Sequence, residues 1–352
     1  MTGIPTEQSQ PSQLQPPRPP RPHKPRVVAV GGGTGTHAVL RGLTPYADTL
    51  DITAIISMAD SGGSTGRLRD EFGQLPVGDV RNALTALAAD SEADEELLRE
   101  LFRYRFERGS GLSGHSFGNL FLTALTDILG SEEVAINAAA RILRTRGRVL
   151  PVTTDQVHLR AVYDDGEEVI GEHEFDDCPP VRAHKRVREL SVTPAARLAP
   201  AAAAALRDAD LIVLGPGDLY PSVLANTVVD GFRDALVESR ATVAYVCNLM
   251  MRPGQTIGCH AAAHVAEVER YLGRAPDVAI INDAPFPEEL LARYRAEGSH
   301  PVENDCAHGV CRVIAGDHVA REAITLPSGE VTERTLIRHD PERLVAVLRT
   351  LV

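Results

Sequence analysis

The 352-residue chain is predicted to form an α/β fold, a Rossmann-like, doubly wound sheet whose strands are mostly parallel. The first observation is a succession of strand, glycine loop, helix and strand: the apolar runs Arg26–Val30 and Ile52–Met58 flank the loop Gly31–Gly35 and a helical stretch. The second is that the pattern returns at Leu211–Leu214, which runs into another glycine loop and a helix. Such units place successive strands side by side in a parallel sheet.

Further strands are expected at Thr242–Cys247 and Val278–Ile281. Between the two halves, residues from about 79 to 145 are predicted to be helical, with one buried face made of four residues at helical spacing. Those four residues are Phe121, Leu125, Ile128 and Leu129. Residues from about 148 to 176 alternate and contain the turn Asp164-Asp165-Gly166, which indicates a small antiparallel β insertion.

Composition limits the organisation and the class of protein. Residues 1–25 contain 8 of the 24 prolines, so we expect a disordered Pro-rich tail followed by a single domain over residues 26–352. A net charge of −12 argues against a nucleic-acid partner, and no run of about 18 apolar residues is present to span a membrane. Five scattered cysteines and the lack of an apolar leader segment indicate a cytoplasmic protein.

Two glycine loops are expected at the carboxyl edge of the sheet, where α/β proteins bind ligands. Backbone N–H groups of the first loop could hold a phosphate group, and its candidate residues are Gly32, Gly33, Thr34 and Gly35. The spacing of Gly33, Gly35 and Ala38 fits a dinucleotide fingerprint, which does not by itself choose between NAD and another nucleotide. The candidate residues of the second glycine loop are Gly215, Gly217, Leu219 and Ser222.

The loop after the second strand is richer in polar groups. Its hydroxyl and N–H groups suit phosphate oxygens, Arg67 could bind a phosphate through two hydrogen bonds, and Asp60 could hold a sugar hydroxyl or a divalent metal. The candidate residues of this loop are Asp60, Gly62, Gly63, Ser64, Thr65 and Arg67. Asn248 has the corresponding place directly after the strand Thr242–Cys247.

Two helix starts supply further candidates near the same edge. Asp79 is suited to be an N-cap, and Arg81 and Asn82 are then either ligand donors or surface residues. His115 and Asn119 begin another helix and could reach a ligand, whereas capping alone explains Ser116 between them.

Six blocks in a fixed order resemble the YvcK-like gluconeogenesis factors, which belong with the CofD-like 2-phospho-L-lactate transferases. The blocks are Val30–Leu43, Met58–Leu84, Tyr104–Leu125, Ala209–Asn226, Cys247–Gly258 and Ile337–Pro341. The resemblance covers nearly all of residues 26–342 and is more specific than any single glycine motif.

The resemblance implies a Rossmann-like fold with a nucleotide pocket at the sheet edge. It also implies one of two activities. YvcK-like proteins bind UDP-sugars without an established catalytic activity and are tied to cell shape and wall-precursor supply in gluconeogenic growth. CofD-like proteins transfer 2-phospholactate from a guanylated donor to a deazaflavin alcohol with the help of a divalent metal.

The resemblance also assigns residues. Tyr294 and Arg338 are the matches for a tyrosine and an arginine that contribute to nucleotide-sugar binding in YvcK-like chains. In such a pocket Arg67 and Arg81 are expected to pair with the diphosphate of the ligand. Asp60 and Asn248 are expected to fix hydroxyl groups of the sugar or polar groups of the base.

The leading hypothesis is therefore a UDP-sugar-binding regulator with no firm cofactor and no metal, whose bound state is read by an unidentified protein partner. The sequence does not determine the oligomeric state, and a homo-oligomer is one possibility. The second hypothesis is a transferase in which Asp60 and Asp79 hold Mg²⁺, although Ser61 stands where many relatives have a second acidic residue. A third is an NAD-dependent oxidoreductase, for which His115 is the acid–base candidate.

Overall fold

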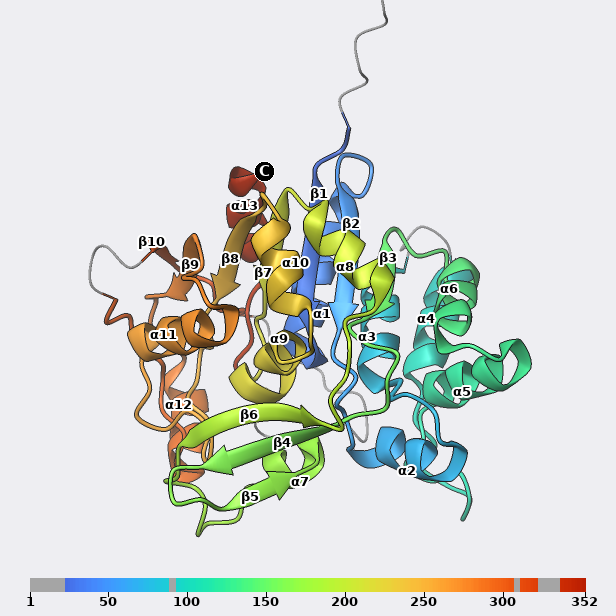
Figure 1. Cartoon of the computed structure of the whole chain (residues 1–352), viewed down its shortest axis with the longest axis horizontal. Helices are drawn as coiled ribbons and strands as arrows, with labels where there is room; N and C mark the ends of the chain where they lie inside the picture. Colours follow the sequence, from blue (N-terminus) through green and yellow to red (C-terminus); the bar gives the residue numbers. More distant parts are fainter. Residues whose placement is uncertain (1–22, 89–92, 307–310, 322–335) are drawn as a thin grey trace, which may run out of the picture.

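A seven-stranded parallel sheet forms the centre of the computed structural model, which describes residues 23–88, 93–306, 311–321 and 336–352 (Figure 1). The strand order is β10-β9-β8-β7-β1-β2-β3, and all neighbours are parallel. The strands are β1 (Arg26–Gly31), β2 (Asp51–Ile56), β3 (Arg148–Pro151), β7 (Leu211–Leu214), β8 (Thr242–Val246), β9 (Val278–Asn282) and β10 (Arg312–Gly316). This confirms the predicted α/β fold. Residues 1–22 of the predicted tail lie outside the described residues.

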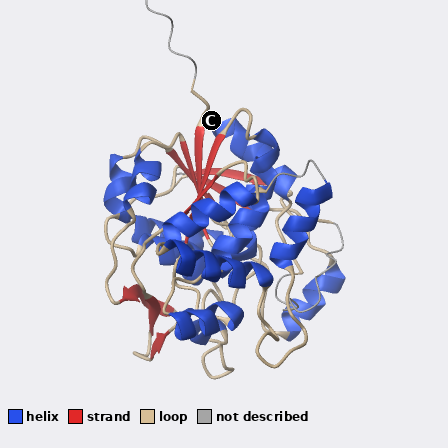
Figure 2. Ribbon diagram, turned by 90° about the vertical axis from the view of Figure 1, so that its right-hand side faces the viewer, coloured by secondary structure: helices blue, strands red, loops and turns tan. Residues whose placement is uncertain are grey.

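The order of the strands creates a switch point between β1 and β7. From β1 the chain proceeds to β2 and β3, and from β7 it proceeds in the opposite direction to β8, β9 and β10. Because such crossovers are right-handed, the helices that follow β1 and β7 cover opposite faces of the sheet. One layer contains α1 (Gly33–Leu43), α3 (Gly78–Leu87) and α13 (Pro341–Leu348), and the other contains α8 (Pro200–Arg207), α10 (Phe232–Glu238) and α11 (Ala261–Leu272) (Figures 1 and 2).

The remaining helices and short turns complete the fold. They are α2 (Gly63–Phe72), α4 (Ala93–Arg103), α5 (Phe117–Leu129), α6 (Glu132–Ile142), α7 (Glu172–Asp176), α9 (Ala225–Thr227) and α12 (Glu288–Ala296), with the short turns η1 (Thr44–Tyr46), η2 (Leu219–Leu224) and η4 (Arg349–Leu351). The predicted helical segment at about 79–145 thus corresponds to α3 to α6. None of the helices in the described ranges is both long and apolar enough to cross a membrane.

The central strands are buried on both faces. Every residue of β7 is buried, as is every residue of β1 after Arg26. Continuous apolar runs of this kind are typical of parallel strands covered by helices on both sides. Each fully buried valine, leucine or isoleucine contributes about 1.5–3 kcal/mol relative to an exposed one, so these strands hold the glycine loops that follow them in fixed positions.

A separate three-stranded antiparallel sheet has the order β5-β4-β6. Its strands are β4 (His158–Tyr163), β5 (Glu168–Ile170) and β6 (Val187–Thr193). The predicted insertion at about 148–176 differs from this sheet at both ends. Residues Arg148–Pro151 form β3 and extend the main sheet beside β2, and the strand that completes the small sheet, β6, begins after residue 176.

The predicted buried face of α5 is wrong in its second half, because Phe121 and Leu125 pack against the core but Ile128 and Leu129 do not. Ile128 is 76% exposed and Leu129 is 41% exposed, whereas Leu122, which was not in the predicted set, is 1% exposed. The helix has apolar residues on all sides, so the spacing of Phe121, Leu125, Ile128 and Leu129 does not define a single inner face. The described neighbours α4 and α6 instead select the side that contains Leu122 and Thr126.

Replacing Leu122 with alanine is expected to lower the free energy of unfolding by about 2–5 kcal/mol, the usual cost of a cavity in a packed core. Ile128→Ala in the same helix is the matched control and should change it by less than about 0.5 kcal/mol. Urea unfolding followed by circular dichroism measures both values. Equal losses in the two variants would contradict the observed orientation of α5.

Candidate functional site

The two glycine loops meet at the switch point between β1 and β7. A β-carbon on Gly35, in the first turn of α1, would overlap the carbonyl oxygen of Pro216 and the backbone nitrogen of Gly217. Gly33 has a φ of +65°, a backbone conformation that favours glycine. Only glycine at these positions lets the loop after β1 and the loop after β7 come this close, and together they form one wall of a cavity.

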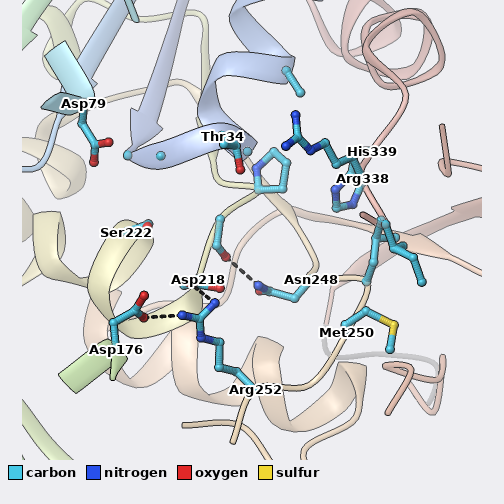
Figure 3. A pocket seen from close by; sticks show the side chains of 18 of the residues that line it. Thr34, Asp79, Asp176, Asp218, Ser222, Asn248, Met250, Arg252, Arg338 and His339 are labelled. Atoms are coloured by element: carbon cyan, nitrogen blue, oxygen red, sulfur yellow. Dashed lines mark hydrogen bonds and ion pairs between the residues drawn. The ribbon is translucent and has the colours of Figure 1, made fainter. Parts of the chain in front are cut away.

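The cavity has a volume of about 330 Å³ and opens at the carboxyl edge of the sheet (Figure 3). Its lining includes backbone from both glycine loops, a group of carboxylates, and two arginines. The lining residues are Gly32, Gly33, Thr34, Gly35, Ala38, Asp60, Asp79, Glu172, Asp176, Pro216, Gly217, Asp218, Ser222, Asn248, Leu249, Met250, Arg252, Tyr294, Ile337, Arg338 and His339.

Three neighbouring carboxyl groups, those of Asp60, Asp79 and Glu172, occupy one end of the cavity. Burial, together with the charge of the nearby Asp60, raises the pKa of Asp79 to about 7. Burial also raises the pKa of Asp60, although the N–H of Gly62 donates to its Oδ1 at 2.9 Å and opposes the change. The pKa of Glu172 is raised by burial and then by Asp60. This end of the cavity therefore holds protons near neutral pH more readily than exposed carboxylates do.

Arg252 also lines the cavity and bridges two acidic residues. Its guanidinium is 2.5 Å from Asp176 Oδ1, at the end of α7, and 2.8 Å from Asp218 Oδ2, in the second glycine loop (Figure 3). Only 18% of the Arg252 side chain is exposed. The two aspartates more than offset the effect of burial and raise the pKa of Arg252, which keeps the guanidinium charged.

The remaining wall comes from segments far apart in the sequence. The Asn248 side chain donates to the carbonyl oxygen of Gly217 at 2.6 Å and accepts from the Tyr245 hydroxyl at 3.2 Å. The hydroxyl of Tyr294, in α12, accepts the N–H of Ile337 at 3.1 Å, directly before Arg338. Tyr294 and Arg338, which the family resemblance assigns independently, therefore lie on the same cavity.

His339 is held in a neutral state beside them. Burial lowers the pKa of its imidazole to about 3, and its Nε2 lies 3.1 Å from the carbonyl oxygen of Cys247. The side chain thus contributes shape to this wall and ties the segment after residue 336 to the end of β8.

Half of the residues predicted from the sequence line the cavity. They are Gly32, Gly33, Thr34, Gly35, Asp60, Asp79, Gly217, Ser222, Asn248, Tyr294 and Arg338. They come from the loops after β1, β2, β7 and β8, from the start of α3, and from the segments around α12 and residue 338. The sheet edge brings together four of these segments, as the order of strands and loops predicts.

The other predicted residues lie behind the cavity wall or away from it. These are Gly62, Gly63, Ser64, Thr65, Arg67, Arg81, Asn82, His115, Asn119, Gly215 and Leu219. Arg67 is exposed and donates to the carbonyl oxygen of Ser113 at 3.1 Å. Arg81 is buried and donates to Asn82 Oδ1 at 2.9 Å.

His115 and Asn119 belong to a buried polar network. His115 Nδ1 lies 3.0 Å from Ser64 Oγ, and the Asn119 side chain donates to the same oxygen at 3.2 Å. Burial lowers the pKa of His115. The network joins the start of α2 to the start of α5, so it supports the loop that carries Asp60 from behind.

Sequence reasoning missed Glu172, Asp176, Asp218, Arg252 and His339. Asp218 and Arg252 have a signal in the sequence, since each follows a strand whose carboxyl end reaches this edge. Glu172 and Asp176 have none, because α7 reaches the cavity only through the packing of the small sheet. His339 adjoins Arg338, but nothing in its own sequence context predicts its burial.

Asp60 and Asp79 are the candidate ligands for Mg²⁺ on the cavity. No group of three or more histidine, cysteine, aspartate or glutamate side chains in the described ranges is arranged to hold a metal ion. Mg²⁺ in proteins usually takes one or two carboxylates and completes its shell with waters and substrate phosphates. The pair therefore fits Mg²⁺ that arrives with a phosphate-bearing ligand, and it does not form a metal cage by itself.

A doubly wound α/β protein with a glycine-walled cavity at its switch point is the class that fold and site define. A family model described as 2-phospho-L-lactate transferase CofD matches residues 27–319, so the chain belongs to this family. It is 43% identical to a Thermotoga maritima protein provisionally named a gluconeogenesis factor, over 93% of this chain and 99% of that one.

Two further relatives agree with this assignment. The chain is 36% identical to the gluconeogenesis factor of Bacillus subtilis, over 93% of this chain and 98% of that one. A crystal structure of a UPF0052 family protein from Bacillus halodurans is similar with a TM-score of 0.82 at 35% identity, and the match covers 93% of this chain and 99% of that one. These findings confirm the resemblance drawn from the six sequence blocks.

Gly35→Ala is expected to lower the free energy of unfolding by about 1–3 kcal/mol, because its β-carbon would force apart the two glycine loops. Gly111→Ala is the matched control, since a β-carbon there meets no atom within 4 Å, and it should leave stability nearly unchanged. Thermal and urea unfolding measure both. A stable Gly35→Ala variant would contradict the close approach of the loops.

Asp79 is expected to make the protein less stable as pH rises. Its pKa is about 7 in the folded protein and about 3.9 in an unfolded chain, so the folded state binds the extra proton between these values. Stability therefore falls as pH rises from about 4 to about 7. This contribution is absent in Asp79→Asn. The free energy of unfolding of the variant, taken relative to that of the wild type, should therefore rise by at least about 1 kcal/mol from pH 5 to pH 8.

Urea unfolding at several pH values measures that difference. Asp127→Asn, in an exposed position of α5, is the control and should follow the wild-type curve. Parallel curves for wild type and Asp79→Asn would show that the Asp79 carboxyl is not held protonated.

Proposed function

We propose that the cavity binds a nucleotide sugar and that the protein acts as a regulator in the cytoplasm, with a UDP-sugar as its ligand. The observation that carries the proposal is the meeting of two glycine loops at the switch point, next to the start of α1. The role suggested is control of cell shape and wall-precursor supply during gluconeogenic growth. The names of the relatives from Thermotoga maritima and Bacillus subtilis support the gluconeogenic part of that role.

The start of α1 suits a diphosphate. The N-cap residue is Gly32, so no N-cap side chain accepts a hydrogen bond from the first N–H groups of the helix. The first turn of α1 also contains no acidic residue. N–H groups and the positive end of the helix dipole then act together on an anion. Asp79 accepts the N–H of Gly33, so a phosphate oxygen that binds there would replace a carboxylate oxygen.

Charge in the cavity favours a ligand that has hydroxyl groups as well as phosphates. Asp60, Asp79 and Glu172 would accept hydrogen bonds from sugar hydroxyls, and a protonated carboxyl tolerates a nearby phosphate better than a charged one. Arg252 and Arg338 are the arginines on the cavity and would be the charge partners of the diphosphate. Asn248 and Tyr294 would then face the base or the ribose.

A second candidate function is transfer of a phosphate-linked group in the manner named by the family model. The observation that favours it is the neighbouring pair Asp60 and Asp79, which fits Mg²⁺ bound together with substrate phosphates. The metal would stabilise charge on the transferred group, and the two carboxylates would position it. For the oxidoreductase hypothesis support is weaker, because His115 does not line the cavity.

Isothermal titration calorimetry of the full chain with UDP-N-acetylglucosamine, GDP and NAD, each with and without Mg²⁺, separates these functions. The regulator proposal predicts binding of the UDP-sugar without Mg²⁺. Arg338→Ala should weaken that binding at least about tenfold, since a hydrogen bond to a charged group contributes about 1.5–3 kcal/mol. Arg67→Ala is the matched arginine control outside the cavity and should change affinity less than about twofold.

Two results of the calorimetry would contradict the regulator proposal. Binding of GDP only in the presence of Mg²⁺, with no binding of the UDP-sugar, would overturn the regulator proposal and favour the transferase. Loss of UDP-sugar binding in Arg67→Ala but not in Arg338→Ala would place the ligand outside this cavity.

A further inference from the structure

The helix α7 connects the small antiparallel sheet to the cavity. It follows β5, and the N–H of Gly171 donates to the carbonyl oxygen of Leu159 in β4 at 2.8 Å. The buried ring of Phe175 lies 6.2 Å from the Tyr163 ring of β4, measured between centroids. The helix α7 thus packs on the small sheet, and its Phe175 ring also lies 6.3 Å from the Tyr220 ring of η2. The same helix presents Glu172 and Asp176 to the cavity.

Two sets of polar contacts hold α7 against the main domain. At its start, the N–H of His173 donates to Ser61 Oγ at 3.0 Å, in the loop after β2. At its end, Asp176 pairs with Arg252 at 2.5 Å and accepts from the Gln255 side chain at 3.3 Å. The Arg252 contact is the charged one. It also reaches Asp218, so a single guanidinium joins α7 to the second glycine loop.

A phosphoryl group in the cavity would compete for the same guanidinium. Arg252 lines the cavity beside Pro216, Gly217 and Asp218, where the second glycine loop offers its backbone. Arginine binds phosphate oxygens through two parallel hydrogen bonds, as it binds carboxylates. A phosphate adjacent to Asp176 and Asp218 would also repel both carboxylates, and the repulsion falls when one of them moves away. Asp218 lies in the loop after the fully buried strand β7, whereas Asp176 ends the five-residue helix α7, of which only Phe175 is buried.

We propose that Arg252 is a ligand-exchanged latch, in which the phosphoryl group of a bound ligand replaces Asp176 as partner of Arg252 and loosens α7. This inference rests on the proposed nucleotide-sugar binding and adds its regulation. The helix α7 then takes up a different position or mobility in the bound state, while the small sheet stays packed on the main core. A protein partner that contacts α7 could distinguish the bound from the unbound protein without contacting the ligand.

Hydrogen–deuterium exchange of the full chain, with and without UDP-N-acetylglucosamine, tests the latch. Peptides covering residues 168–180 report on α7, where the N–H of Phe175 bonds to Gly171 and that of Asp177 bonds to His173. Ligand should increase exchange of these amides at least about tenfold while it slows exchange in the first turn of α1. Most ligands slow exchange in the segments that line their site, so an increase in α7 is a distinctive result.

Variants test the latch without any ligand. Arg252→Gln should raise exchange in α7 about tenfold in the unliganded protein, and Asp176→Asn, which breaks the same pair from the other side, should do the same. The matched control is Arg160→Gln, which removes exposed ion pairs with Glu168 and Glu189 inside the small sheet and should leave α7 exchange unchanged.

The outcomes separate the two proposals. If the ligand binds but exchange in α7 falls or stays the same, the latch is wrong and the proposed function stands. If no ligand binds while Arg252→Gln and Asp176→Asn still release α7, the Arg252 contact holds α7 but the proposed function and its ligand exchange are wrong. If neither variant alters α7 while both remain folded, Arg252 does not hold it and the latch is overturned.

Discussion

The close approach of two glycine loops at the switch point is the constraint on which the rest of the site depends. β1 and β7 are neighbours in the sheet, and the chain leaves them in opposite directions, so their following loops border a crevice. Gly35 allows the first turn of α1 to contact Pro216 and Gly217 directly. A side chain there would separate the loops, and the N–H groups on the two sides would no longer act on one ligand.

Charge determines what this crevice is suited to bind. Asp60, Asp79 and Glu172 oppose a purely anionic ligand, whereas Arg252 and Arg338 attract one. A molecule with both hydroxyls and phosphates suits both groups of side chains, and the proposed nucleotide sugar is such a molecule. The carboxylates would repel a substrate phosphate, and a Mg²⁺ ion placed between them and the phosphate would relieve this repulsion. The transferase candidate therefore requires the metal.

Much of the fold and part of the site could be predicted from the sequence. Apolar runs followed by glycine loops identify β1 and β7, and strand ends identify Asp60 and Asn248, because these are local signals with a fixed geometric meaning. The buried face of α5 could not be predicted, since apolar residues surround the helix and its neighbours decide which side is covered. Arg67 and Arg252 illustrate the same limit. Both are arginines in polar loops, and only tertiary packing turns Arg67 toward Ser113 and Arg252 toward the cavity.

The proposed ligand, a nucleotide sugar, binds with its diphosphate between the two glycine loops. A crystal structure of the full chain with UDP-N-acetylglucosamine would show its position. We expect phosphate oxygens within hydrogen-bond distance of N–H groups at the start of α1 and in the loop after β7, with sugar hydroxyls near Asp60 and Asp79. A ligand bound elsewhere on the protein, with no contact to either glycine loop, would contradict this placement.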